Sequence, residues 1–288
     1  MIETILQLAA NGIMSGAVLA VAAIGFTMMF AVLRFPNFSL AGHMAGGAYA
    51  GWIANTMFGL PLPLALLCGF LVAGGIGVAS DFIVLRPLRR AAPITLAIAS
   101  VAISLFIENA LRFGFGNDLR SFDLPLARDW VIGWLRLGPQ QVQNAGLAIV
   151  AMLILFVIFT FTQTGRAMRA TADNAGLAAV KGIDTEKITR LVSFLGMGLA
   201  GAAGVLLGAD TSIEPLLGLK VILSVFAAAV LGGLGSIPGA VLGAFAIGIV
   251  EEASQIVVPA TYKGAVGFVA ILLVLSFRPS GFLGRRQT

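Results

Sequence analysis

Apolar segments long enough to cross a lipid bilayer follow one another along almost the whole chain, and they constrain its fold more than any other feature. A helix needs about 20 apolar residues to cross the hydrocarbon core. The sequence therefore predicts an all-α polytopic membrane protein with about nine transmembrane helices, within a range of eight to ten, some of them short or broken. The nine runs are Ile13–Leu33, Leu40–Met57, Leu62–Leu85, Ile94–Phe115, Ala145–Thr162, Ile188–Gly208, Leu216–Leu231, Ile237–Val258 and Gly264–Phe277.

The composition excludes an ordinary soluble enzyme. Of the 288 residues, 59% are hydrophobic and only 11% are charged, against roughly a quarter charged in soluble domains. We expect residues 1–288 to form a single transmembrane domain. The single cysteine, Cys68, and the single histidine, His43, exclude a disulfide or a closed zinc site built from this chain alone.

The basic residues predict the orientation, because cytoplasmic loops carry an excess of Lys and Arg. With nine spans, twelve of the 18 basic residues fall on one side of the membrane. This division predicts an outside N-terminus and an inside C-terminus. The inner set is Arg34, Arg86, Arg89, Arg90, Arg166, Arg169, Lys181, Lys187, Arg190, Arg278, Arg285 and Arg286, and the outer set is Arg112, Arg120, Arg128, Arg136, Lys220 and Lys263.

Two hydrophilic segments interrupt the apolar pattern. Residues 116–144 are expected outside, where Trp130 and Trp134 would serve as interfacial anchors. Residues 163–187 are expected inside. There the stretch 173–182 predicts a short helix with Asp173 as its N-cap and Gly182 as its C-terminal stop.

Small residues give this short helix a face that could lie in a groove of another protein, namely Ala175, Ala178 and Ala179. Asp184 then supplies a second cap and leads directly into the next membrane helix, so a force on the short helix would pass into the bundle. The alternative is a solvated connector, since an isolated helix of about ten residues is marginal in water.

Five sets of motifs follow one another along nearly the whole chain: Gly16–Gly25 with Phe30–Arg34 and Asn37-Phe38, Arg86–Arg89, Gly165–Ala170 with Gly182-Ile183, Leu231–Ala240 with Glu251, and Arg278–Gly284. In this order they resemble the LivH and LivM family, the membrane permeases of bacterial ABC importers of the branched-chain amino acid type, with LivH the closer.

The resemblance implies a multi-pass permease of the bacterial inner membrane that moves branched-chain amino acids, or a related small polar or carboxylate solute, by alternating access. Its partners would be a second permease, by family a different LivM-type chain, two ATPase subunits and a periplasmic substrate-binding protein, with no nucleic acid. The ATPase-coupling residues would be Asp173, Asn174, Gly176, Ala178, Ala179 and Gly182.

The resemblance also implies that this chain is not itself an enzyme. ATP and Mg would bind the partner ATPase subunits, and no cofactor would bind this chain. The sequence agrees, because no Gly-x-x-x-x-Gly-Lys-Ser/Thr phosphate loop occurs in it.

One departure from the family pattern bears on the substrate. Family members commonly follow Asn-Phe with Ala-His-Gly and an acidic residue, whereas here the histidine position is Leu40, the acidic position is Gly42, and His43 follows. The ammonium group of an amino acid would lose a candidate acidic contact. A small carboxylate without an ammonium group is therefore a competing substrate.

Polar groups inside apolar helices are costly and usually face protein or water. We take Asn37, His43, Glu108 and Glu251 as candidates for the translocation pathway. Structural alternatives stay open for each ionisable group: an i,i+4 ion pair of Glu108 with Arg112, an interior histidine, and a packing hydrogen bond of Glu251. Asp81 is expected to extend to the inner interface.

Glycine and alanine recur at every fourth position in three segments, which indicates closely packed helix faces. The stretch Gly232–Pro238 predicts either a break between two half-helices or a tight hairpin. The three faces are Gly12, Gly16 and Ala20; Ala200, Gly204 and Gly208; and Gly235, Gly239 and Gly243.

Two other functions compete with the importer permease. An ion-coupled secondary transporter of small organic acids would use broken helices and buried carboxylates, but the buried acids are few. An intramembrane enzyme is the weakest interpretation, because the chain has one histidine and no His-Glu-x-x-His or paired Asp motif.

Overall fold

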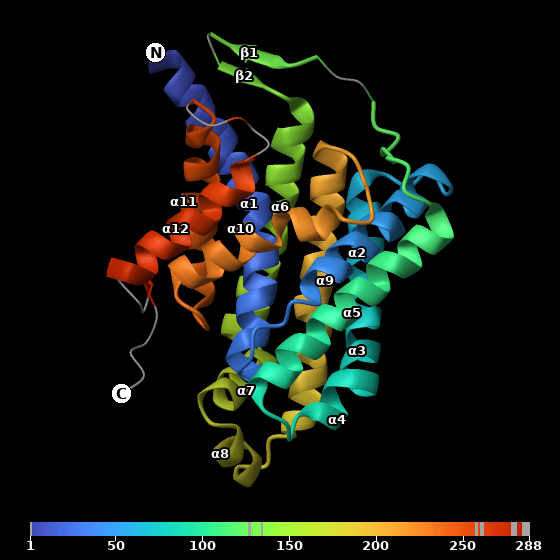
Figure 1. Cartoon of the computed structure of the whole chain (residues 1–288), viewed down its shortest axis with the longest axis vertical. Coiled ribbons are helices and arrows are strands. Elements are labelled where there is room, and N and C mark those ends of the chain that lie inside the picture. Colours follow the sequence, from blue (N-terminus) through green and yellow to red (C-terminus); the bar gives the residue numbers. More distant parts are fainter. Residues whose placement is uncertain are drawn as a thin grey trace.

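The computed structural model describes residues 2–125, 128–133, 135–256, 259, 262–277 and 281–283. Helices account for most of them (Figure 1). Their bounds are α1 Ile2–Leu33, α2 Leu40–Thr56, α3 Leu62–Ser80, α4 Arg86–Leu88, α5 Pro93–Phe115, α6 Pro139–Phe161, α7 Gln163–Asp173, α8 Ala175–Val180, α9 Thr185–Asp210, α10 Leu217–Gly232, α11 Ile237–Ser254 and α12 Lys263–Phe277.

Each of the nine predicted apolar runs overlaps one of these helices, and the end of the eighth run at Val258 lies outside the described residues. A π-helical turn, Asp81–Leu85, joins α3 to α4 and makes one continuous helix over Leu62–Leu88. Among the described residues, six helices are long and apolar enough to cross a membrane: Glu3–Leu33, Leu62–Leu88, α5, α6, α9 and α11. The all-α polytopic prediction is confirmed, whereas the number of nine crossings stays a prediction because α2, α10 and α12 are shorter.

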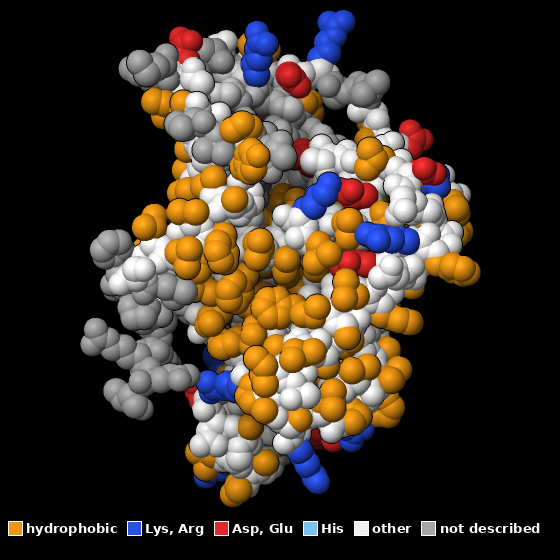
Figure 2. All heavy atoms as spheres, viewed as in Figure 1, with side chains coloured by type: hydrophobic (Ala, Val, Ile, Leu, Met, Phe, Trp, Pro, Cys, Tyr) orange, Lys and Arg blue, Asp and Glu red, His pale blue; other side chains and the backbone are white. Residues whose placement is uncertain are grey.

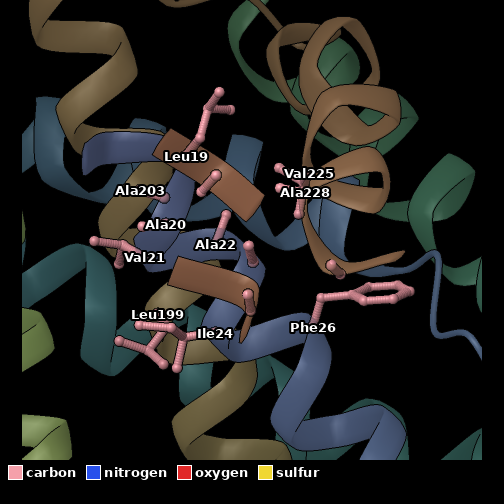
Figure 3. Close-up of a cluster of buried hydrophobic side chains, with 14 of the residues drawn as sticks. Leu19, Ala20, Val21, Ala22, Ile24, Phe26, Leu199, Ala203, Val225 and Ala228 are labelled. Atoms are coloured by element: carbon pink, nitrogen blue, oxygen red, sulfur yellow. The ribbon is translucent and has the colours of Figure 1, made fainter. Parts of the chain in front are cut away.

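Helix α1 runs through the centre of the bundle, where it packs against α9 and α11 (Figure 3). Its middle residues are almost all buried alanines and branched aliphatics, which meet Leu199 and Ala203 of α9. Small side chains allow close approach: a Cβ atom on Gly12 would lie 2.6 Å from Ile249 Cα, and one on Gly16 3.0 Å from Phe245 Cα. The first predicted small-residue face therefore packs against α11.

The second predicted small-residue face is also in close contact. A Cβ atom on Gly204 would lie 2.0 Å from the Met44 carbonyl oxygen of α2. In the third set, Gly239 and Gly243 pack against α10, but Gly235 lies in the turn before α11 with φ +91°. The Gly232–Pro238 stretch is therefore a tight hairpin between α10 and α11, the second of its two interpretations.

The two short helices α2 and α10 begin inside the protein and meet there. Residues Ser39, Leu40 and Ala41 at the start of α2 are fully buried. A Cβ atom on Gly218, at the start of α10, would lie 1.9 Å from the Ala41 carbonyl oxygen. Figure 1 shows both helices near the middle height of the bundle.

Hydrophobic side chains cover the middle of the face in Figure 2, and charged side chains gather mainly above it and at its lower tip. Helices α5 and α6 supply many exposed apolar residues, among them Ile98, Phe106, Leu153 and Phe156. Such a band is the surface expected of a protein whose solvent is lipid.

The segment between α5 and α6 crosses the upper end of the bundle in Figure 1. It contains an antiparallel hairpin of β1, Trp130–Ile132, and β2, Leu135–Leu137, a small departure from the all-α prediction. Gln7 of α1 holds the hairpin by donating to the Arg136 carbonyl at 2.7 Å and accepting from its N–H at 2.9 Å. Trp130 is exposed, as an anchor requires, whereas Trp134 lies outside the described residues.

Candidate functional site

Helices α7 and α8 form the lower tip of the molecule in Figure 1. Thr162 caps α7 by accepting a hydrogen bond from the Gly165 N–H at 3.0 Å. Two arginines fasten α7 to the bundle, because Arg169 donates to the Phe159 carbonyl at the end of α6 and Arg34 donates to the Ala172 carbonyl at the end of α7. The predicted short helix corresponds to α8 alone, and α7 is a further helix that precedes it.

Asn174, not Asp173, caps α8. The Asn174 side-chain oxygen accepts the Leu177 N–H at 2.9 Å, and Asp173 is the last residue of α7. The prediction of Asp173 as the N-cap was therefore wrong by one residue, since either side chain satisfies the same rule. The stop at Gly182 is confirmed: α8 ends at Val180, and Gly182 adopts φ +84°.

The exposed face of α8 differs from the predicted one. Ala178 is only 4% exposed and faces the protein, whereas Leu177 is 58% exposed and Val180 is 83% exposed. Ala175, Gly176 and Ala179 are exposed beside them. A partner would therefore meet two branched apolar side chains on a background of small residues, and Ala178 is corrected to an inward-facing position.

Asp184 caps α9 as predicted. Its Oδ1 accepts the Lys187 N–H at 3.0 Å, and Lys187 Nζ lies 3.4 Å from Oδ2. The backbone hydrogen bond from Lys187 is the main reason that the pKa of Asp184 is lowered from its ordinary value. Three residues, Lys181 to Ile183, thus separate α8 from Asp184, the cap of a helix that runs into the centre of the bundle.

Asn37 and His43 are both buried at the start of α2. The Asn37 side-chain oxygen accepts from the Ser39 N–H at 3.1 Å and from the Ser39 hydroxyl at 2.7 Å. Nδ1 of His43 lies 2.7 Å from the Ser39 carbonyl oxygen. Both side chains therefore hold the turn that begins α2.

Glu108 lies in the same region, but it does not form the predicted ion pair with Arg112. It accepts a hydrogen bond from the Ser104 hydroxyl at 2.9 Å and is 1% exposed. Among the residues that the structure describes, no ion pair joins it to Arg112. Ser104, on the buried side of α5, also lies four residues from Glu108. Burial favours a bond to its neutral hydroxyl over an ion pair with Arg112, because burying a charged pair is costly.

Two serines of α5 complete the start of α2, and the sequence reasoning missed them. The Phe38 N–H donates to the Ser100 hydroxyl at 2.9 Å, and the Gly42 N–H donates to the Ser104 hydroxyl at 2.8 Å. These hydroxyls satisfy backbone groups that a helix start leaves unpaired. The signal was present in the sequence, since Ser100, Ser104 and Glu108 recur every four residues on one helix face.

The structure also explains the departure at Gly42. A Cβ atom there would lie 2.9 Å from the Ser104 backbone, so an acidic side chain does not fit against α5 in this packing. Glu108 nevertheless brings a carboxylate to the neighbourhood, because Ser104 bonds both the Gly42 N–H and Glu108.

Glu251 lies apart from this cluster. It is buried on α11 and accepts a hydrogen bond from the Ser224 hydroxyl of α10 at 2.5 Å. Asp81 is buried as well and pairs with Arg89 at 2.6 Å, and its extension to the inner interface stays a prediction. The structure thus brings together Asn37, His43 and Glu108, but not Glu251.

These features define a multi-pass helical membrane protein with an exposed helix, α8, linked by a short turn and a cap to a central helix of the bundle. Among the described residues, no group of three or more His, Cys, Asp or Glu side chains could hold a metal ion.

Comparison with known proteins places the chain more narrowly. It belongs to the family described as branched-chain amino acid transport system / permease component, whose model matches residues 8–275. The permease LivH of the high-affinity branched-chain amino acid transport system of Escherichia coli (strain K12) is 32% identical, covering 98% of this chain and 96% of the relative. The permease BraD of the corresponding system of Pseudomonas aeruginosa is 33% identical over the same shares.

A solved structure supports the fold. A chain from an inward-facing structure assigned to a metal-chelate type ABC transporter superposes with a TM-score of 0.51, at 15% identity, over 95% of this chain and 88% of that one. The likeness concerns the arrangement of the helices alone.

Proposed function

We propose that this chain is the permease subunit of an ATP-driven importer of branched-chain amino acids or a related small polar or carboxylate solute. The observation that carries the proposal is its match to LivH over 98% of its length. The geometry of α8 supports it, because Leu177 and Val180 are exposed next to a capped central helix. Glu108, next to the start of α2, is a carboxylate that an amino acid's ammonium group could use.

In this proposal residues 1–288 form one transmembrane permease domain of the bacterial inner membrane. The N-terminus lies outside and the C-terminus inside, so residues 163–187 form the cytoplasmic coupling segment and residues 116–144 a periplasmic loop. The basic residues near α7 and α8, including Arg34, Arg166 and Arg169, favour this orientation.

The partners would be two ATPase subunits, a substrate-binding protein on the outside and a second permease of the LivM type. ATP and Mg would bind the ATPase subunits, and this chain would undergo alternating access without chemistry of its own. Docking would involve the α8 segment, with Asn174 and Gly182 fixing its two ends and Leu177 and Val180 forming the contact.

The test is reconstitution of the chain with its ATPase subunits, second permease and binding protein in proteoliposomes. We expect uptake of radiolabelled leucine that requires ATP and the binding protein. Uptake by this chain alone, driven by a proton or sodium gradient without ATPase subunits, would overturn the proposal in favour of an ion-coupled transporter of small organic acids.

A further inference from the structure

A groove of about 920 Å³ opens at the lower end of the bundle. It lies between the ends of α1 and α6, helix α7 and the turn between α10 and α11. None of the α8 residues and none of the buried cluster around Asn37 lines it. The groove therefore shares only the α7 part of the coupling segment, including Asp173, with the regions considered above.

Two arginines, Arg34 and Arg169, line this groove. Arg34 donates to the Ala172 carbonyl, and Arg169 donates to the Phe159 carbonyl while its guanidinium carbon lies 5.4 Å from the centre of the Phe159 ring. An arginine carries five N–H donors, and each of these two donates one hydrogen bond among the described residues. Further donors remain for an anion, and guanidinium groups bind phosphate well.

The start of α11 adds to the positive potential of the groove. Gly235, Ser236 and Ile237 line it, and α11 is an 18-residue helix whose N-cap is Ser236. The first N–H groups of a helix lack intrahelical partners and attract anions. Here Pro238 has no N–H and the Ser236 hydroxyl accepts the Gly239 N–H at 3.2 Å, so the Ile237 N–H and the positive end of the helix dipole remain for an anion. Asp173 is the acidic residue among the lining residues; it lies at the exposed rim and has interactions of its own. The two arginines and the helix end outweigh this one carboxylate.

The groove also continues onto the apolar surface of the bundle. Phe156 lines it and is 56% exposed, and Leu153 and Val157 are exposed on the same helix, α6. An occupant that satisfies the whole groove therefore carries an anionic group at one end and a hydrocarbon chain at the other. A free anion would leave the apolar part empty, whereas the exposed apolar side chains of α6 form the kind of surface that contacts hydrocarbon.

We propose that the groove binds an anionic phospholipid of the membrane leaflet on the α7 side. The phosphate would lie between Arg34, Arg169 and the start of α11, and an acyl chain would lie along α6. Basic pockets between helices near the cytoplasmic side bind anionic headgroups in this way. The leaflet is the inner one if the orientation proposed above is correct, but the binding itself does not depend on transport.

The experiment measures retention of phosphatidylglycerol by the delipidated full-length chain in detergent, using native mass spectrometry, with phosphatidylcholine as the neutral comparison. The double variant Arg34→Gln with Arg169→Gln removes both charges, and each glutamine can still donate to the helix carbonyl. We expect its affinity for phosphatidylglycerol to fall roughly tenfold or more, while phosphatidylcholine is unaffected. The matched control is Arg166→Gln on the exposed side of α7, which should retain the native affinity.

A second variant tests the groove without changing charge. Ala172→Leu places extra volume in it and should also weaken phosphatidylglycerol binding, while thermal unfolding of the lipid-free chain reports whether the fold is kept. Equal retention of phosphatidylglycerol by the native chain and the double-glutamine variant would overturn the proposal. Complete displacement of the lipid by inorganic phosphate would assign the site to a free anion instead.

A third result would also overturn the proposal of a bound phospholipid. If the double-glutamine variant lost ATPase-subunit binding but retained lipid unchanged, the occupant of the groove would be a protein. Because lipid retention is measured without ATP, substrate or partners, a failure here leaves the proposed transport function standing. Conversely, a failure of ATP-dependent uptake would leave this result unaffected.

Discussion

The contact between α2 and α9 and the surface of α8 are opposite kinds of interface on neighbouring parts of one chain. At the first, a Cβ atom on Gly204 would lie 2.0 Å from the Met44 carbonyl oxygen, and one on Gly47 would lie 2.2 Å from Gly201 Cα. At the second, Leu177 and Val180 are largely exposed. The first interface has no room for a methyl group, whereas the second lacks a partner among the described residues.

The two regions therefore have different expected roles: one transmits movement and the other contacts a partner. Close-packed helices move together and transmit strain, so α2 and α9 are expected to move as a unit. Helix α8 is joined to α9 by a short turn and the Asp184 cap. A displacement of α8 by a partner would therefore reach α2 through α9.

The largest effect is expected from filling the closed interface. In Gly204→Leu the side chain would collide with the backbone of α2, and backbone cannot move aside as a flexible side chain can. We expect a loss of about 3 kcal/mol or more, seen as a lower midpoint of thermal unfolding or as loss of the monodisperse protein in detergent.

The matched control is Gly75→Ala on α3, where a Cβ atom would have no neighbour within 4 Å. Its stability should be unchanged or higher by up to about 1 kcal/mol, because alanine favours a helix over glycine. Equal stability of Gly204→Leu and Gly75→Ala would remove the distinction between a closed and an open interface.

A smaller effect, on association and not on folding, is expected at the exposed surface. The double variant Leu177→Glu with Val180→Glu should weaken binding of the ATPase subunits roughly tenfold or more, because two carboxylates without partners would be buried in the contact. The midpoint of thermal unfolding should remain that of the native chain, since both side chains already face outward. Binding is measured by co-purification at graded ATPase concentrations.

Ala178→Arg provides the contrast within the same helix. Because Ala178 is buried against the protein, this variant should lower the unfolding midpoint before it affects association. A fully stable Ala178→Arg protein that fails to bind the ATPase would restore the face predicted from sequence and contradict the structure.

The sequence predicted the elements well because membrane helices carry a strong local signal. All nine apolar runs became helices, and the caps at Gly182 and Asp184 lie where the residue types placed them. Local rules determine such features, since a helix end depends on a few neighbouring residues.

Which side of a helix is buried could not be read in the same way. Ala178 and Leu177 are adjacent in a six-residue helix, and only the packing of α8 against α7 and α9 decides that Ala178 is the buried one. The partner of Glu108 was likewise a choice between Ser104 and Arg112, each four residues away. Long-range packing determines both which α8 residue is buried and which residue bonds Glu108, and a local sequence pattern does not contain that information.

The smallest effect tests the link between the two regions. Asp184→Ala removes the side chain that accepts the Lys187 N–H, so the first turn of α9 should open more often, seen as faster hydrogen exchange of the Lys187 amide. Asp184→Asn keeps an acceptor and should exchange nearly as slowly as the native chain.

Because the folded pKa of Asp184 is lowered, its charged form stabilises the cap above the ordinary aspartate pKa of about 3.9. That stabilisation is lost as pH falls through the lower, folded pKa. Asp184→Asn should lack this pH dependence, and an identical pH profile in both proteins would show that the cap does not depend on the charge.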